Sequence, residues 1–238
     1  MKILALETSA KSVSVAVLED GKVLGSAYQN TGLTHSRTLM PLLDGMLTNS
    51  ELSLNDMDII AVAAGPGSFT GLRIGVSAAK GLAWAQSLPC CGVSTLEAMA
   101  QNVRHMEDYT VICAMDARRN QVYNAVFHVE NGSLVRMAPD RAIALEELAA
   151  EIKNDENAKI IVGDGAHLCY TYLSEQGIAC TMAPPALVMQ NAVGVAQVAF
   201  EMAGRGETVN AHALVPVYLR LSQAERERLA KGLKITLD

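Results

Sequence analysis

The sequence predicts an α/β protein built from two related halves. An apolar strand that ends on a carboxylate opens each half, at residues 3–7 (Ile-Leu-Ala-Leu-Glu) and at residues 111–116 (Val-Ile-Cys-Ala-Met-Asp). An alternating strand begins six residues after each carboxylate, and each of these strands is followed by a tight turn, Asp20-Gly21 or Asn131-Gly132. The repeated order of strand, carboxylate, strand and turn indicates an internal duplication.

The first half contains the elements of a β-β-β-α-β-α-β unit. A helix is expected from Thr34, because its apolar residues recur on one face, and Pro41 should kink this helix near its start. A second helix, rich in small residues, is expected over 72–85. The strands are expected at 2–6, 12–18, 23–28, 59–64 and 90–93.

The second half continues with a helix over 145–152, a strand over 160–162, a Gly163-Asp164-Gly165 turn and further helix. A polar stretch between Gln101 and Asp108 marks the boundary, which gives domains 1–104 and 105–238, the second smaller and degenerate. The helix over 190–202 either closes the second core or packs back on the first.

Composition limits the classes of function. Half of the 238 residues are hydrophobic, yet no apolar run approaches the roughly 18 to 20 residues that span a bilayer, and the start is too short for a signal-peptide core. We therefore expect a cytoplasmic protein without membrane contact. The five cysteines form no Cys-x-x-Cys pair and are expected to be reduced, mostly buried thiols.

The formal net charge of −6 argues against unaided nucleic-acid binding, because such binding depends mainly on clustered Lys and Arg. Basic residues are notable only in the tail, where they alternate with Glu225 and Glu227, as on a solvated helix face. They are Arg220, Arg226, Arg228, Lys231 and Lys234.

A glycine-rich junction follows the apolar run 59–64. Residues 65–71 read Gly-Pro-Gly-Ser-Phe-Thr-Gly and lead into the small-residue helix, where free N–H groups at the helix start could bind an anion or a partner. The helix carries Gly71, Gly75 and Gly81, each of which costs about 1 kcal/mol relative to alanine. Another backbone that approaches closely would offset this cost.

A duplicated domain that opens with a strand, a carboxylate and a Thr/Ser turn is typical of the actin, sugar-kinase and Hsp70 (ASKHA) fold. Beyond the fold, four segments carry a closer similarity: 3–9, 65–75, 92–96 and 115–118 (Met-Asp-Ala-Arg). With these segments the chain resembles the TsaB (YeaZ) family, whose members are partner subunits in bacterial tRNA threonylcarbamoyladenosine synthesis.

The resemblance implies a noncatalytic partner of TsaD, the subunit that transfers threonylcarbamoyl to adenosine 37 of tRNAs reading codons that begin with adenine. It also implies a complex with the ATPase TsaE, contact with tRNA only through the complex, and a homodimer when the protein is alone. No cofactor of its own is implied, and ATP or ADP at the partner interface is left open.

The resemblance further implies that the metal site of the catalytic relative is lost. Thr95 and Met99 stand where that family has two histidines, and Gln190 corresponds to its aspartate ligand; neither Thr95 nor Met99 replaces a histidine as a ligand for a hard metal. The five histidines are scattered, without zinc-like spacing. Structural roles are expected for them, with His35 as a candidate for an interfacial hydrogen bond.

The two helices of the first half are the expected partner interface. Small residues and leucines recur at helical spacing on the second helix and leave one side with little bulk, while the first helix has more apolar positions than one face needs. The alternative is that the apolar residues of both helices are simply buried in the protein's own core. The candidate interface residues are His35, Leu39, Met40, Leu43, Leu72, Arg73, Gly75, Ala78, Ala79 and Leu82.

An actin-like nucleotide-binding protein or ATPase is the rival function. Residues 7–9 lack the glycine of a phosphate loop and 65–71 lack the Gly-Lys-Ser/Thr ending of a P-loop, while 163–165 is either a phosphate loop or a plain turn. For Asp116 and Arg118 the alternative is a salt-bridged turn. The candidate loop or nucleotide contacts are Glu7, Thr8, Ser9, Gly67, Ser68, Asp116 and Arg118.

A glycoprotease-like peptidase is the least favoured function. A metalloprotease needs a metal and a general base, and a serine or cysteine peptidase needs a nucleophile paired with a base. The sequence offers no local motif of either kind, such as Gly-x-Ser-x-Gly.

Overall fold

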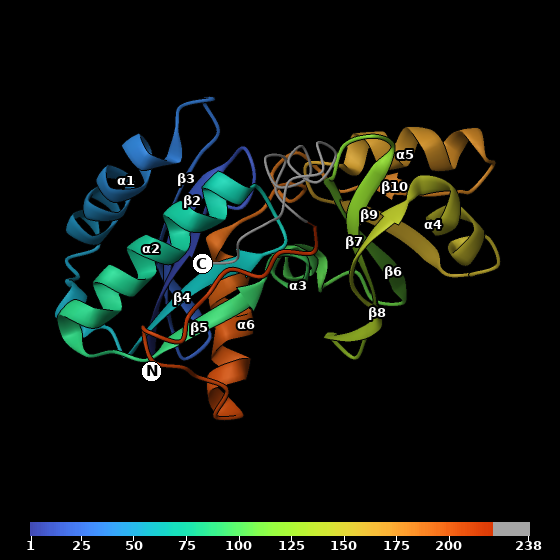
Figure 1. Ribbon diagram of the computed structural model, residues 1–238. Helices are drawn as coiled ribbons and strands as arrows, with labels where there is room; N and C mark the ends of the chain where they lie inside the picture. Colours follow the sequence, from blue (N-terminus) through green and yellow to red (C-terminus); the bar gives the residue numbers. More distant parts are fainter. Residues whose placement is uncertain (221–238) are drawn as a thin grey trace.

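The computed structural model describes residues 1–220, which form two five-stranded sheets (Figure 1). The first sheet has the order β3-β2-β1-β4-β5 and the second has the order β10-β9-β6-β7-β8. Read from its other edge, the second sheet has the order of the first with every number raised by five. In both sheets two antiparallel hairpins are followed by two parallel pairings. The strands are β1 (Lys2–Glu7), β2 (Val13–Glu19), β3 (Lys22–Gln29), β4 (Ile59–Gly65), β5 (Cys90–Ser94), β6 (Tyr109–Asp116), β7 (Gln121–Glu130), β8 (Ser133–Ala144), β9 (Ala158–Val162) and β10 (Thr181–Met182).

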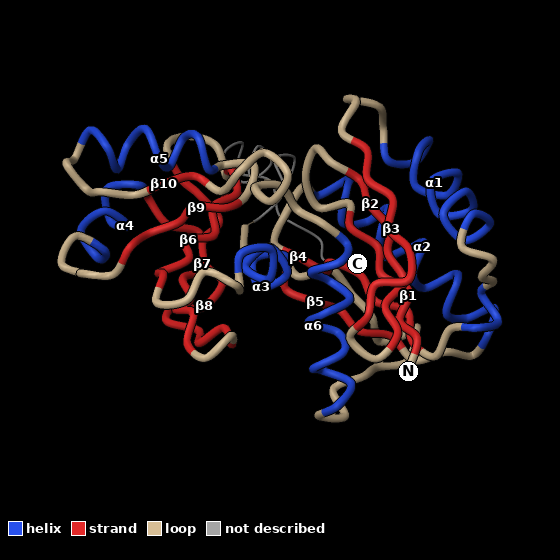
Figure 2. Tube along the Cα trace, turned by 180° about the vertical axis from the view of Figure 1, so that it is seen from behind, coloured by secondary structure: helices blue, strands red, loops and turns tan. Residues whose placement is uncertain are grey.

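The helices complete a layered arrangement. On one face of the first sheet lie α1 (His35–Asn49) and α2 (Phe69–Gln86), and on its other face lies α6 (Ala192–Gly204). The short helix α3 (Thr95–Ala100) lies between the two sheets and contacts both (Figure 2). The outer face of the second sheet is covered by α4 (Leu145–Ile152) and α5 (Ala166–Glu175). Two 3-10 turns, Leu54–Asp56 and Gln101–Val103, complete the helical elements of the described part.

This topology confirms the predicted duplicated α/β fold. The tight turns have the expected positive φ angles, at Asp20 and Gly21 and again at Asn131 and Gly132. The second helix begins at Phe69, three residues before its predicted start, because the Ser68 hydroxyl accepts a hydrogen bond from the Gly71 N–H at 3.3 Å and so caps the helix. Helix α1 continues through Pro41 to Asn49.

The chain returns to the first half after completing the second sheet. The inner side of α6 packs on residues of β1, β2, β4 and β5, so the predicted helix over 190–202 belongs with the first sheet. The following segment, drawn in orange-red in Figure 1, pairs Val209 with Cys90 and then places the Val217 N–H 2.7 Å from the Ala64 carbonyl. Residues from both ends of the sequence therefore build the first half.

The sequence also led to expectations about the cysteines, membrane-spanning segments and the basic tail. Cys90, Cys91, Cys113 and Cys169 are buried free thiols and Cys180 is half-buried, as predicted. Within residues 1–220, no helix combines the length and apolarity needed to cross a bilayer. The predicted solvated helix face of the basic tail lies outside the described residues from residue 221 onward.

The glycines of α2 lie against the turn between β1 and β2. A Cβ atom on Gly71 would lie 2.1 Å from the Thr8 carbonyl oxygen, and one on Gly75 would lie 2.3 Å from Thr8 Oγ1. The Thr8 hydroxyl donates a hydrogen bond to the Gly71 carbonyl at 2.8 Å, which closes the contact. The closely approaching backbone is therefore that of the chain's own turn.

Replacing Gly71 by alanine should destabilise the protein by about 1–3 kcal/mol, because the new methyl group meets backbone that cannot rotate away. Gly81→Ala is the matched control: it lies on the same helix with no atom within 4 Å of the added Cβ, so it should be neutral or stabilise by up to about 1 kcal/mol. Urea unfolding of both variants tests this, and equal effects would contradict the close packing.

Candidate functional site

The outward side of α1 and α2, called here the α1–α2 face, is one candidate site. Met40 on α1 is 45% exposed, and Trp84 on α2 is 79% exposed. Arg73 and Ser77 of α2 are exposed on the same helix. An exposed tryptophan and methionine are residue types enriched in protein–protein interfaces, so this face has the composition of a docking surface.

Half of the predicted interface residues are buried in the core and do not lie on the α1–α2 face. Leu39, Leu43, Leu72 and Ala79 are at most 3% exposed and pack in the chain's own core. Gly75 is buried against Thr8 and Val62. These five residues do not lie on the surface, because the small side of α2 packs on the first sheet and its β1–β2 turn, and Leu39 and Leu43 of α1 pack in the same core.

The remaining predicted interface residues are at or near the surface. Ala78 and Leu82 are half-buried beside the core. The ring of His35 is half-buried, and its Nε2–H donates to the Ala10 carbonyl at 2.7 Å, so this hydrogen bond lies within the chain and fixes the start of α1. The guanidinium of Arg73 lies 3.9 Å from the Phe69 ring centroid and its Nε donates to the Tyr218 hydroxyl.

Sequence reasoning missed Trp84, which is the most exposed large apolar side chain of the described residues. The sequence did contain a signal that Trp84 lies on the outer side of α2. Trp84 comes four residues after Lys80, so the two share one side of the helix, and smaller residues already supply the buried stripe.

A cavity of about 390 Å³ between the two halves is the second candidate site. Five of the seven predicted loop residues line it: Ser9, Gly67, Ser68, Asp116 and Arg118. The first three come from the β1–β2 turn and the start of α2, and the other two from the turn between β6 and β7. Lys11 and Arg220 also line the cavity and were not predicted to do so, and Asp164 lines it from the 163–165 turn, which was expected to be either a phosphate loop or a plain turn.

The turn between β6 and β7 is not the salt-bridged turn that was the alternative expectation for Asp116 and Arg118. The Arg118 backbone N–H donates to Asp116 Oδ1 at 2.7 Å, and no ion pair joins the two side chains among residues 1–220. The hydrogen bond leaves the Arg118 guanidinium exposed at the cavity. Asp116 thus acts as a local turn former.

Glu7 and Thr8 lie behind the cavity and are fully buried. Glu7 Oε1 accepts a hydrogen bond from the Ser9 N–H at 2.5 Å, whereas its Oε2 has no partner within the described residues. Burial, with a smaller contribution from the negative charge of Asp164, raises the pKa of the Glu7 carboxyl to about 7. The Glu7 carboxyl therefore keeps its proton up to about pH 7, well above the pH at which an exposed glutamate releases it.

The positions expected to have lost a metal site are all buried. Gln190 Nε2 donates to Asp164 Oδ1 at 3.0 Å, while Thr95 Oγ1 and Gln190 Oε1 lack partners in the part of the chain that is described. Met99 belongs to the apolar cluster between α3 and the second sheet. Among residues 1–220, no group of three or more His, Cys, Asp and Glu side chains is arranged to bind a metal ion.

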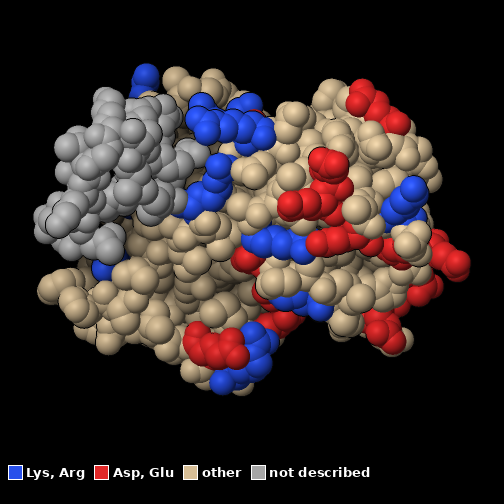
Figure 3. Space-filling model, turned by 45° about the vertical axis from the view of Figure 1, so that its right-hand side comes forward, with Lys and Arg blue, Asp and Glu red and all other residues tan. Residues whose placement is uncertain are grey.

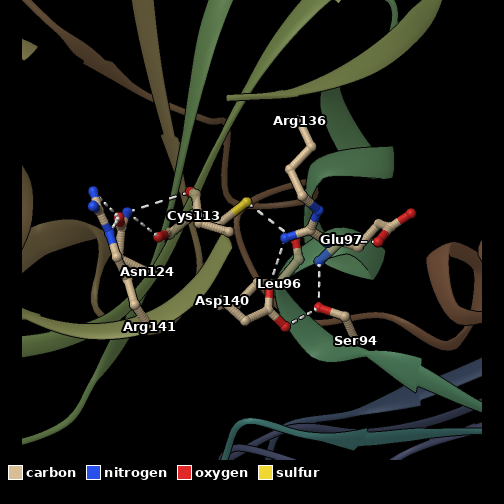
Figure 4. Close-up of polar contacts among 9 residues, drawn as sticks. Ser94, Leu96, Glu97, Cys113, Asn124, Arg136, Asp140 and Arg141 are labelled. Atoms are coloured by element: carbon tan, nitrogen blue, oxygen red, sulfur yellow. Dashed lines mark hydrogen bonds and ion pairs between the residues drawn. The ribbon is translucent and has the colours of Figure 1, made fainter. Parts of the chain in front are cut away.

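A polar network joins α3 and the end of β5 to β8 of the second sheet (Figure 4). Arg136 of β8 pairs with Glu97 of α3 at 2.6 Å and with Asp140 at 2.7 Å. The Ser94 hydroxyl, at the end of β5, donates to Asp140 at 2.5 Å. These contacts fix α3, and with it the end of the first sheet, against the edge of the second sheet.

Two halves with one strand order, facing each other across a cavity, define a duplicated actin-like protein. The family model described as tRNA N6-adenosine threonylcarbamoyltransferase matches residues 29–227. The chain belongs to the TsaB (YeaZ) family, as the following relatives show.

Similarity to curated proteins extends over nearly the whole chain. The tRNA threonylcarbamoyladenosine biosynthesis protein TsaB of Bacillus subtilis (strain 168) is 34% identical over 94% of this chain and 96% of that protein. The protein of the same name from Escherichia coli (strain K12) is 32% identical over 92% and 95%. The solved structure of YeaZ from Pseudomonas aeruginosa matches with a TM-score of 0.77 and 29% identity over 92% of this chain and 99% of that one.

Glu7→Gln should change stability in a pH-dependent manner. With a pKa of about 7 when folded and 4.5 when unfolded, Glu7 keeps a proton in the folded state that the unfolded chain has released, so its ionisation destabilises the fold as pH rises through this window. Glutamine removes this cost. The gain in unfolding free energy over the unsubstituted protein should be about 2 kcal/mol larger at pH 8 than at pH 5 in urea titrations.

Asp58→Asn is the matched control for that measurement, because Asp58 is exposed and its carboxylate accepts a hydrogen bond from the Lys2 N–H at the other end of β1. This substitution should give no such stabilisation at pH 8. A Glu7→Gln gain that is the same at both pH values would show that the Glu7 carboxyl is not held neutral.

Proposed function

We propose that this protein takes part in tRNA threonylcarbamoyladenosine biosynthesis as the noncatalytic partner of the TsaD transferase. The observation that carries the proposal is the α1–α2 face, where Trp84 and Met40 lie exposed on helices whose inner sides are already buried. Membership of the family supports a role in this pathway, and the exposed apolar side chains of this face support binding to a partner protein.

The noncatalytic role is supported by the side chains at the positions of the expected metal ligands. Thr95, Met99 and Gln190 are fully buried; Met99 packs in the apolar cluster of α3 and the second sheet, and Gln190 donates a hydrogen bond to Asp164. A threonine, a methionine and an amide do not form a site for a hard metal ion. In this proposal the chain needs no cofactor of its own, and the transferase performs the chemistry.

The proposed complex includes the ATPase TsaE, and tRNA binds through the assembly rather than to this chain alone. A net charge of −6 supports this view, because unaided binding to nucleic acid depends on clustered positive charge. In the absence of TsaD, a second copy of the chain would use the α1–α2 face, so homodimer and heterodimer compete for the same apolar side chains.

Reconstituted modification of unmodified tRNA should require this chain. With the threonylcarbamoyl-adenylate synthase, TsaD, TsaE, ATP, threonine and bicarbonate present, omission should reduce modification at adenosine 37 by at least about tenfold, which corresponds to roughly 1.4 kcal/mol. The chain should give no modification when it replaces TsaD. Modification that is indifferent to its presence would contradict the proposed function.

Met40→Asp should weaken binding to TsaD by at least about tenfold, because burying a charge in an apolar interface is costly. Trp84→Ala should have a similar effect through the loss of a large apolar contact. Met137→Asp is the control: Met137 is 65% exposed on β8 of the other half, so the same substitution should leave the affinity within about twofold.

These affinities can be measured by isothermal titration calorimetry after thermal unfolding has shown that each variant is folded. Equal affinities for Met40→Asp and Met137→Asp would place the interface elsewhere. A loss of affinity in the control alone would point to the second half as the partner surface.

A further inference from the structure

Methionine supplies the most accessible oxidisable sulfur in this chain. All 11 methionines of the sequence lie within residues 1–220, and their exposure varies widely. Four are buried in the apolar cores, Met46 of α1 among them, and three are half-buried. The exposed ones are Met1, Met40, Met137 and Met182. Because a hydroperoxide must reach the sulfur atom to oxidise it, these four are expected to react first.

The cysteine thiols do not compete with these methionines for an oxidant. Four of the five are buried and Cys180 is half-buried. Burial raises the pKa of the Cys91 thiol to about 11 and that of the Cys169 thiol to about 12, and it also raises the pKa of Cys180. Since the thiolate is the form that reacts with peroxide, shielding and a raised pKa both slow cysteine oxidation.

Met40 is the exposed methionine of the α1–α2 face. It is 45% exposed, and no other large apolar side chain of α1 is as accessible. Arg37, three residues before it, and Asp44, four residues after it, are exposed polar side chains on the same side of the helix. A partner that packs on α1 therefore gains its main apolar contact with this helix from the Met40 thioether.

Two other exposed methionines serve as internal references. Met137 lies on β8 and Met182 on β10, both in the second sheet and away from the α1–α2 face. Met137 is more exposed than Met40, so an oxidant reaches it at least as easily. Oxidation at these positions changes the same chemical group without changing the proposed partner surface.

Access rather than charge selects the methionine that an uncharged oxidant reaches. Lys and Arg side chains gather beside the grey residues in Figure 3, whereas acidic side chains predominate on the opposite side of that view. Such a distribution of charge steers ions toward or away from parts of the surface. Hydrogen peroxide carries no charge, so the exposure of each sulfur atom governs its reaction.

Oxidation changes the chemistry of the Met40 side chain. The sulfoxide carries a polar S–O bond and is a hydrogen-bond acceptor, whereas the thioether is flexible, polarisable and apolar. Burying an acceptor in an apolar contact without a donor is unfavourable. A partner that covers Met40 therefore loses affinity when this sulfur is oxidised.

We propose that Met40 is a modification site, where oxidation to the sulfoxide by hydrogen peroxide weakens partner binding at the α1–α2 face. A lone pair of Met40 Sδ forms the S–O bond, the O–O bond of the peroxide breaks, and the other oxygen leaves as water. The sulfur loses two electrons and the peroxide gains them. A methionine sulfoxide reductase with a thiol reductant reverses the step. The inference rests on the proposed partner function, because the face must bind a protein for its oxidation to matter.

Peroxide titration of the full-length chain, followed by peptide mass spectrometry, tests the modification. Met40 should reach half-oxidation at a peroxide dose at least about fivefold lower than Met46, which is buried on the same helix. An excess of TsaD should protect Met40 and leave Met137 reactive. Oxidation of Met40 that is no faster than that of Met46 would overturn the proposal, as would a TsaD complex in which Met40 is unprotected.

Calorimetric titration with TsaD tests the effect on binding. The chain is oxidised alone, freed of peroxide and shown to be folded before TsaD is added. Its affinity should fall by at least about fivefold, and treatment with methionine sulfoxide reductase and dithiothreitol should restore it. An unchanged affinity with Met40 fully converted to the sulfoxide would overturn the proposal.

Met40→Leu removes the sulfur and keeps an apolar side chain. Whatever the starting affinity of this variant, peroxide treatment should change it by less than about twofold. Met137→Leu is the matched control: it should start with the affinity of the unsubstituted chain and lose it on oxidation to the same extent. A Met40→Leu chain that still loses affinity on oxidation would place the sensitive residue elsewhere and contradict the proposal.

The untreated chain separates this proposal from the partner function. An untreated chain without affinity for TsaD contradicts the partner function and the effect of oxidation with it. An ordinary affinity that oxidation of Met40 leaves unchanged contradicts the modification proposal alone.

Discussion

The contact between the β1–β2 turn and the first two turns of α2 sets the geometry of both candidate sites. Gly67, Gly71 and Gly75 have no side chains, so the backbone of Thr8 and Ser9 can lie directly against the helix. One consequence is that the inner side of α2 is buried inside the molecule, so Trp84 lies on the outside. The other is that Ser9 and Ser68 meet at one wall of the cavity. Glycine has a low helix propensity, but only glycine at these positions allows the backbone of the turn to approach so closely.

A polar network between α3 and β8 holds the two halves against each other. Arg136, Glu97 and Asp140 are partly shielded from water, with side chains 32%, 30% and 23% exposed, and each charge has a partner at hydrogen-bond distance. Screening is weaker for such a network than for an isolated surface pair, so it helps to fix orientation. The apolar residues of α3 and α6 between the sheets add non-directional burial to this directional network.

The sequence was sufficient for the duplication, the order of the elements and the family, because strand and helix periodicity and turn residues act locally. It was insufficient for the orientation of α2. A stripe of small residues shows that something approaches closely, but both a partner helix and the chain's own turn satisfy that pattern, and Gly75 proved to face Thr8. Lys11 and Arg220 were missed as cavity residues for a related reason: they come from distant segments and line one cavity only when the halves meet. Seven loop residues were predicted as a group; five of them line the cavity, whereas Glu7 and Thr8 do not.

The return of α6 to the first sheet affects the order in which the chain can fold during synthesis. The face of the first sheet that includes Ile3, Ala5 and Ala61 is covered by residues 192–204, which are made long after β5. The second sheet, by contrast, draws its strands from one continuous stretch, 109–182. Most multidomain chains complete their amino-terminal unit first as they leave the ribosome. Here the later half can close before the earlier one, and the nascent first sheet carries a bare apolar face that chaperones would have reason to bind.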